Sequence, residues 1–213
     1  MAVVALSATG CTAATQSTPD SAATAAASVP ATTTLDLSQV LVQPDGYQAP
    51  KEDSVSGPVQ GVGDVRRIFT DHPEDPAFIM GHGFVRGYIR AWHQDLPGAD
   101  TDPMVDLDAA TLMAVVLEMD TADHASDVVG HFRSKNTEDG YQIFQVPAQL
   151  SNGYGMYAKQ GEQVFTYIYG VSWACGRYTF DIMLGYANEA SAEPVKALAV
   201  AQHAAVCGTL TTR

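Results

Sequence analysis

Apolar and polar residues alternate near the end of the chain in a pattern that predicts one strand followed by one helix. From Arg177 to Leu184 every second residue is apolar, which is the period of a strand with one face on a core. Apolar residues then recur at helical spacing between Val195 and Val206, with Ser191 as an N-cap candidate before them and Gly208 just after them. We therefore expect the domain to close with a strand and a helix.

Two cysteines, Cys175 and Cys207, lie at the outer ends of this strand and helix. A strand of about eight residues rises roughly 26 Å and a helix of about sixteen residues returns roughly 24 Å, so the two sulfur atoms should come to the same level. We predict a disulfide between them, worth roughly 3 to 4 kcal/mol in the chain-entropy model. The alternative is a pair of buried free thiols.

Earlier segments show the same two periods. The segment from Gly83 to Trp92 fits both a helix and a strand, and we favour a strand because its glycines destabilise a helix. Leu112 to Met119 is almost wholly apolar, as a central strand would be, and Thr121 or Asp123 can cap a helix that continues to about Arg133. The other predicted elements are a strand at Val65 to Phe69, a helical turn at Asp75 to Met80, and strands at Tyr141 to Val146, Tyr154 to Ala158 and Gln163 to Tyr169. This order predicts an α+β fold, an antiparallel sheet of about five to seven strands with two main helices packed on one face.

The N-terminal segment carries signs of export. Residues 1–11 form a short apolar run that ends in small residues and Cys11, which is typical of a bacterial lipoprotein signal whose cysteine is lipidated. No Lys or Arg precedes the run and the run is short, so a chance cysteine in a disordered N-terminus stays open as the alternative. Residues 12–34 are almost all Ala, Thr, Ser and Pro, which predicts a disordered tether. We expect a lipid anchor at Cys11, this tether, and one folded domain over residues 35–210.

These segments together resemble a known group of proteins. They are the cysteine with its tether, the LDLSQV opening, the GHGFVRGYIRAW stretch, the apolar strand with an Ala-rich helix after it, and the closing strand and helix. In this combination the chain resembles actinobacterial envelope lipoproteins of unknown function, as found in mycobacteria and nocardiae. The resemblance implies an envelope location and a fold, and it transfers no catalytic residues.

Composition narrows the possible partners. The net charge of −13 and the presence of four lysines argue against a nucleic-acid partner, because a phosphate backbone needs a basic surface. The same charge argues against binding an anionic membrane surface electrostatically, so we expect membrane contact through the lipid anchor. No apolar run approaches the roughly 18 residues of a spanning helix. The expected location is the outer side of the cytoplasmic membrane.

Two groups of histidines are candidates for chemistry. On a helix, His124, Asp127 and His131 share one flank, but they lack the pair of histidines four residues apart that makes a zinc helix specific. Three further histidines lie near acidic residues that could take part in general acid and base catalysis. This second group consists of His72, His82 and His93 with Asp71, Asp75 and Asp95. Both groups also fit ordinary polar surfaces, and we expect no metal, no cofactor and no catalytic residue.

Aromatic and basic residues are the candidates for ligand binding. Arg86 and Arg90 alternate with Tyr88 and Trp92, and several tyrosines follow later in the chain. Our candidate binding residues are Arg86, Tyr88, Arg90, Trp92, Tyr167 and Tyr169. Such side chains suit an envelope lipid, a glycan or a protein partner. The alternative is that the rings pack beneath loops and that the arginines pair with nearby carboxylates.

We therefore predict an exported, lipid-anchored protein that binds a ligand or partner without catalysis. A secreted hydrolase that uses His82, His93 and Asp95 is one alternative. A structural subunit of an envelope complex, with the acidic loop from Asp95 to Asp108 as its contact, is another.

Overall fold

The structure is a computed structural model. It describes residues 35–50, 53, 55–68, 73–94, 111–159, 167–186 and 191–210. Cys11, the tether and the acidic loop at 95–108 lie outside the described residues.

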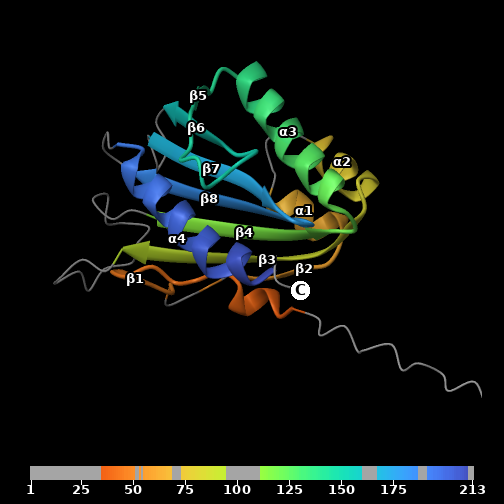
Figure 1. The fold of residues 1–213 in the computed structure, drawn as a ribbon, viewed down its shortest axis with the longest axis horizontal. Helices are drawn as coiled ribbons and strands as arrows, with labels where there is room; N and C mark the ends of the chain where they lie inside the picture. Colours follow the sequence, from red (N-terminus) through yellow and green to blue (C-terminus); the bar gives the residue numbers. More distant parts are fainter. Residues whose placement is uncertain are drawn as a thin grey trace, which may run out of the picture. The chain divides into compact units, whose positions relative to one another are not determined.

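Within the described residues, eight strands form one sheet in which every pairing is antiparallel (Figure 1). The strands run in the order β1-β3-β4-β8-β7-β6-β5, and β2 also pairs with β3. Their bounds are β1 (Tyr47–Gln48), β2 (Gly57–Val59), β3 (Phe84–Gln94), β4 (Thr111–Met119), β5 (Gln142–Phe144), β6 (Tyr154–Lys159), β7 (Tyr167–Cys175) and β8 (Tyr178–Tyr186). The predicted α+β class with an antiparallel sheet is confirmed.

Helices connect and cover these strands. They are the short 3-10 helix η1 (Leu37–Gln39), α1 (Val62–Ile68), α2 (Asp75–Gly81), α3 (Ala122–Glu138) and α4 (Glu193–Leu210). The hydroxyl of Thr121 caps α3 by accepting a hydrogen bond from the backbone N–H of His124. The strand predicted at Val65 to Phe69 is wrong, because residues up to Ile68 belong to α1. Val65 is fully buried and Ile68 is partly buried three residues later, which is a helical spacing.

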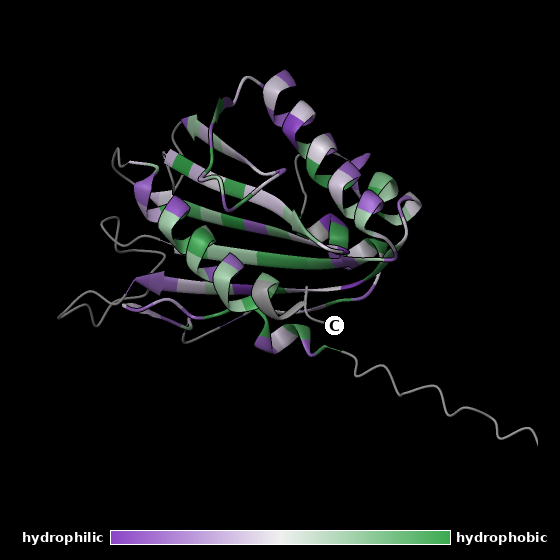
Figure 2. Cartoon of the chain, viewed as in Figure 1, coloured by the Kyte–Doolittle hydropathy of each residue, from purple (hydrophilic) through white to green (hydrophobic). Residues whose placement is uncertain are grey.

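The two long helices lie on opposite faces of the sheet, which corrects the prediction that both would pack on one face. Val115 and Leu117 of β4 belong to the core that contains the buried side chains of α3. Ala114 and Val116 belong to the core that contains the buried side chains of α4. Because β4 is apolar on both faces, each face needs its own cover. Figure 2 shows β4 coloured as hydrophobic over most of its length.

A disulfide and a pair of hydrogen bonds hold helix α4 on its face of the sheet. Cys175 at the end of β7 and Cys207 near the end of α4 form the predicted disulfide, with their Cα atoms 5.9 Å apart. Earlier in the helix, the buried side chain of Gln202 binds the backbone of the segment that follows η1. We call this segment, residues 40–44, the strap. Figure 1 shows α4 lying across the strands, with η1 beside it.

Candidate ligand-binding face

Register places all six predicted ligand-binding residues on the face of the sheet that α4 covers. Trp92 pairs with Leu112, Leu112 with Leu184, and Leu184 with Tyr169, so these four side chains form one row across the sheet. Arg86, Tyr88 and Arg90 lie at even spacings from Trp92 along β3, so they are on the same face as Trp92. Tyr167 lies two residues from Tyr169 on β7 and shares its face. These residues come from two strands far apart in the chain, and the strand register places them on a common face.

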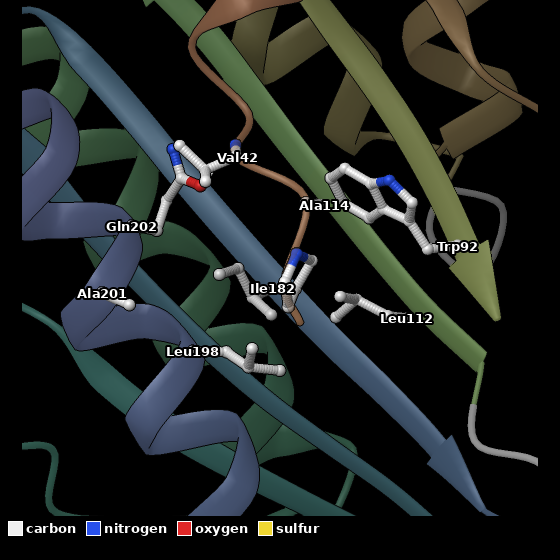
Figure 3. Close-up of a pocket in the computed structure, with 9 residues that line it drawn as sticks. Val42, Trp92, Leu112, Ala114, Ile182, Leu198, Ala201 and Gln202 are labelled. Atoms are coloured by element: carbon white, nitrogen blue, oxygen red, sulfur yellow. Dashed lines mark hydrogen bonds between the residues drawn. The ribbon is translucent and has the colours of Figure 1, made fainter. Parts of the chain in front are cut away.

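A small apolar cavity lies between this face, α4 and the strap. Its volume is about 50 Å³. Trp92, Leu112 and Ile182 rise from the sheet, while Leu198 and Ala201 approach from α4 (Figure 3). The remaining lining residues are Val42, Pro44, Ala114 and Gln202. Nearly every wall is apolar, so an apolar group is the chemistry that this cavity accepts.

Gln202 fixes the strap as one wall of the cavity. Its side-chain oxygen accepts a hydrogen bond of 2.9 Å from the backbone N–H of Val42, and its amide nitrogen donates to the carbonyl of Val40. The residue is only 4% exposed, so a buried amide in an apolar helix face has both polar ends satisfied by strap backbone. Gln202 therefore holds the strap in place and does not offer a free polar group to a ligand.

Four tyrosines from β6, β7 and β8 form a cluster on the same face, and we call them the tyrosine cluster: Tyr157, Tyr167, Tyr169 and Tyr186. The ring centroids of Tyr157 and Tyr169 are 4.9 Å apart, and those of Tyr169 and Tyr186 are 6.0 Å apart. Because Leu184 stands between Leu112 and Tyr169 in register, Tyr169 lies two strand spacings from Leu112 and one strand spacing from β8, which carries the cavity residue Ile182.

Within the tyrosine cluster, Tyr186 keeps its proton at neutral pH. Burial raises the pKa of Tyr186 to about 12 and also raises the pKa of nearby Tyr47. Neutral phenol groups both donate and accept hydrogen bonds, so the half-buried members of the cluster offer polar tips beside apolar rings. A surface of this kind suits an amphipathic molecule.

Two cations lie over rings at the edge of this region. The guanidinium of Arg90 is 5.6 Å from the centroid of Tyr88 and 5.9 Å from that of Trp92. The ammonium of Lys159 is 5.4 Å from the centroid of Tyr167. All three contacts are within cation–π range, so the aromatic face carries positive charge at its rim in a chain that is strongly acidic.

Arg86 has a structural partner instead. Its Nε lies 2.6 Å from a carboxylate oxygen of Glu118, and its Nη2 donates to the carbonyl of Leu35 at 2.7 Å. Glu118 is 3% exposed and also pairs with Arg177. A buried carboxylate between two guanidinium groups is strongly destabilised if either partner is removed. For Arg86 the alternative of local pairing therefore holds.

Among the described residues, the structure does not bring together either of the two histidine groups that were candidates for chemistry. His82 precedes β3 and His93 lies within β3 near its other end, whereas His72, Asp71 and Asp95 lie outside the described residues. On α3, His124 contacts Asp120 whereas His131 contacts Asp75. Within the part of the chain that the structure describes, no group of three or more His, Cys, Asp or Glu side chains has a metal-binding arrangement.

Sequence reasoning missed a buried polar network on the α3 face. Asp181 of β8 is buried and accepts a hydrogen bond from the hydroxyl of Ser172, and burial raises the pKa of its carboxyl to about 6. Nearby, the amide of Asn136 donates to the hydroxyl of Tyr154 at 2.8 Å. The available signal was Asp181, the one acidic residue within the strand that alternation predicts here.

Comparisons with known proteins give a fold and little more. No protein-family model matches the chain, and no curated protein matches it. Among solved structures, the fold is similar to the extracellular domain of PknH from Mycobacterium tuberculosis, with a TM-score of 0.51 and 10% sequence identity. The match covers 83% of this chain and 95% of that one. The same fold therefore occurs in an extracellular domain of a mycobacterial protein.

Within the described part of the chain, no helix is long and apolar enough to cross a bilayer.

Proposed function

We propose that this chain is an exported, lipid-anchored envelope protein that binds an amphipathic small molecule on the α4 face. The observation that carries the proposal is the apolar cavity beside the tyrosine cluster. An apolar portion of the ligand enters between α4 and the strap, and its polar portion lies on the tyrosine hydroxyls. A cavity of about 50 Å³ is smaller than an acyl chain needs, so the strap moves outward when the ligand binds.

The chemistry of the cavity supports binding rather than catalysis. Its lining is apolar apart from Gln202, whose amide is already bound to the strap. A catalytic site needs a nucleophile, an acid or a base within reach of the substrate, and the described cavity walls supply none of these groups. Binding without turnover is therefore the function that this face supports best.

The anchor is the second half of the proposal. Lipidation of Cys11 would hold the protein on the outer side of the cytoplasmic membrane, with residues 12–34 as the tether. The disulfide supports an oxidising location, since such bonds persist mainly outside the cytosol. Intact mass spectrometry of the protein from its own host tests this half: an acylated Cys11 is expected, and an unprocessed, fully reduced chain would overturn it.

Fluorescence quenching tests the binding half. The chain has two tryptophans, and Trp92 lines the cavity whereas Trp173 stacks on Phe180 under α4. The probe is bromododecanoate, whose bromine quenches a tryptophan that it contacts. In Trp173→Phe, which retains Trp92, we expect saturable quenching. In Trp92→Phe, which retains Trp173, we expect much weaker quenching.

Two matched substitutions on α4 locate the probe. Ala201 lines the cavity and Ala205 does not, and both side chains are exposed on the helix. Ala201→Phe, made in the Trp173→Phe background, should fill the cavity entrance and weaken quenching at least tenfold, whereas Ala205→Phe should leave it unchanged. Equal quenching in both variants would mean that the probe binds elsewhere and would refute the site.

A further inference from the structure

Two histidines from different elements meet on the α3 side of the sheet, away from the α4 face. His82 follows the last turn of α2, and His124 lies in the first turn of α3. Their ring centroids are 5.7 Å apart and the ring planes are nearly perpendicular, at 80°. Figure 1 shows α1, α2 and the first half of α3 gathered at one end of the sheet. The two rings are 42 residues apart in sequence, so only the fold brings them together.

The hydrogen bonds of the two rings determine which nitrogen is free. Nδ1 of His82 lies 2.8 Å from the carbonyl oxygen of Phe78, and Nδ1 of His124 lies 2.6 Å from a carboxylate oxygen of Asp120. A carbonyl can only accept, so Nδ1 of His82 carries the proton. A carboxylate oxygen also accepts, so Nδ1 of His124 donates to Asp120. With the Nδ1 proton held by these bonds, Nε2 is the nitrogen of each ring that can offer a lone pair to a metal ion.

This arrangement is the one that metal-binding histidines use. Such a histidine commonly donates its other ring N–H to a carboxylate or a backbone carbonyl, which fixes the tautomer and the ring orientation. Here Asp120 and the Phe78 carbonyl fill those two roles. Among the described residues, neither Nε2 has a hydrogen-bond partner, and His124 is 38% exposed, so an ion can reach it from solvent.

The backbone next to His82 and the backbone turn before α3 lie close together. The N–H of Asp120 donates to the carbonyl of Gly83 at 2.8 Å, which joins the residue after His82 to the turn before α3. Gly83 has φ of +69°, and a Cβ there would collide with the Asp120 carboxylate. Glycine at this position therefore allows Asp120 to orient His124 beside His82.

We propose that His82 and His124 bind a divalent transition-metal ion such as Zn²⁺ through their Nε2 atoms, with Asp120 positioning His124. Zinc binds imidazole nitrogen at about 2 Å, so two rings on one ion have centroids on the order of 5 to 6 Å apart, as found here. Because the described residues contain no third ligand in place, water completes the coordination. The net charge of −13 favours a cation.

His131 shows why the pair is specific. Its ring stacks on Phe78, with centroids 3.8 Å apart, but its Nε2 is bound to Asp75 at 2.7 Å. That bond uses Nε2, the atom with which His82 and His124 bind the ion in this proposal. Nε2 of His131 is therefore not available to a metal ion. His203 lies on α4, on the other face of the sheet, and serves as a control for the loss of one imidazole.

Zinc titration of the full chain, prepared without a histidine tag and stripped with chelator, tests the proposal. Calorimetry should show one saturable site in the presence of excess Mg²⁺. His82→Ala and His124→Ala should each weaken Zn²⁺ binding at least tenfold, and Asp120→Asn should weaken it 10- to 100-fold, by analogy with other orienting carboxylates. His203→Ala should bind like the wild type, and urea midpoints confirm that each variant is folded.

A spectroscopic measurement on the wild-type protein removes any dependence on folding of the variants. In imidazole ¹⁵N spectra, Zn²⁺ should shift the Nε2 signals of His82 and His124 and leave those of His131 in place. The proposal is overturned if the chain shows no saturable Zn²⁺ binding, if His82→Ala and His124→Ala bind as tightly as the wild type, or if the Nε2 signals do not move.

Discussion

Replacing Asp181 by asparagine should abolish a pH dependence of stability that originates in one buried carboxyl. Asp181 lies between the sheet and α3, where its only hydrogen bond among those described comes from Ser172. Burial raises its pKa from 3.8 to about 6, because the charged form loses its hydration without gaining a cation. Asparagine has almost the same shape, cannot ionise in this range, and retains an oxygen that can accept from Ser172.

The magnitude follows from linkage. A shift of roughly two units corresponds to about 3 kcal/mol at 1.36 kcal/mol per unit. The folded-state pKa of Asp181 is raised. Below the unfolded-state pKa near 4 the carboxyl is neutral in both the folded and the unfolded chain, so it does not lower the free energy of unfolding. As pH rises from about 4 through 6, the unfolded chain ionises first and the wild type loses stability. Above about pH 7 the full cost of about 3 kcal/mol is present.

Urea unfolding at intervals between pH 4 and pH 8 measures this effect. The quantity to follow is the free energy of unfolding of the wild type minus that of Asp181→Asn, because the contributions of all other carboxylates cancel. The asparagine N–H groups need partners that aspartate does not, so the absolute offset is less informative than its slope with pH.

The difference should fall by about 2.5 kcal/mol over this range, because the unfolded-state carboxyl is already partly ionised at pH 4. Asp127→Asn, on the exposed side of α3, controls for removing one negative charge. A difference that stays constant within about 0.5 kcal/mol between pH 4 and pH 8 would refute the assignment of a buried, late-ionising carboxyl.

Three further substitutions test the contacts that hold the fold. Replacing Cys175 and Cys207 by serine should lower the unfolding free energy by about 3 to 4 kcal/mol, because the disulfide closes a loop with a sequence separation of 32; an unchanged urea midpoint would contradict this. Gly83→Ala should cost about 1 to 3 kcal/mol in urea unfolding, since alanine is strained at φ +69° and would press on Asp120; a neutral result would show that the turn adapts. Gln202→Ala should cost about 1 to 3 kcal/mol and increase amide hydrogen exchange in the strap, because two buried backbone groups lose their partner, whereas unchanged exchange would mean that the strap is held otherwise.

Much of the fold could be predicted from the sequence because the signals are local. Alternation identified β8, and the matched lengths of β8 and α4 predicted the disulfide between Cys175 and Cys207. The stripe predicted for α3 contains the side chains that are buried there, with Ala125 and Phe132 at its ends. The prediction that both long helices pack on one face was wrong, because β4 is apolar on both faces and each face needs its own cover.

The candidate site was less accessible because its contacts are long-range. A common face for Trp92 and Tyr169 follows from alternation only when strand order is known, and β4 and β8 intervene between their strands. Gln202 binds backbone 160 residues earlier in the chain, and no side-chain pattern signals such a partner. The pairing of His82 with His124 depends in the same way on how α2 meets α3. Local patterns therefore locate faces, and the three-dimensional fold determines which groups on a face meet.

Native mass spectrometry of the full chain, isolated from the envelope fraction of its own host, tests the central claim most directly. The wild type and Ala205→Phe should carry a noncovalent small-molecule adduct on the folded protein, and Ala201→Phe, which fills the cavity entrance, should carry little or none. Absence of an adduct from all three proteins, or the same adduct on all three, would contradict ligand binding at the α4 face.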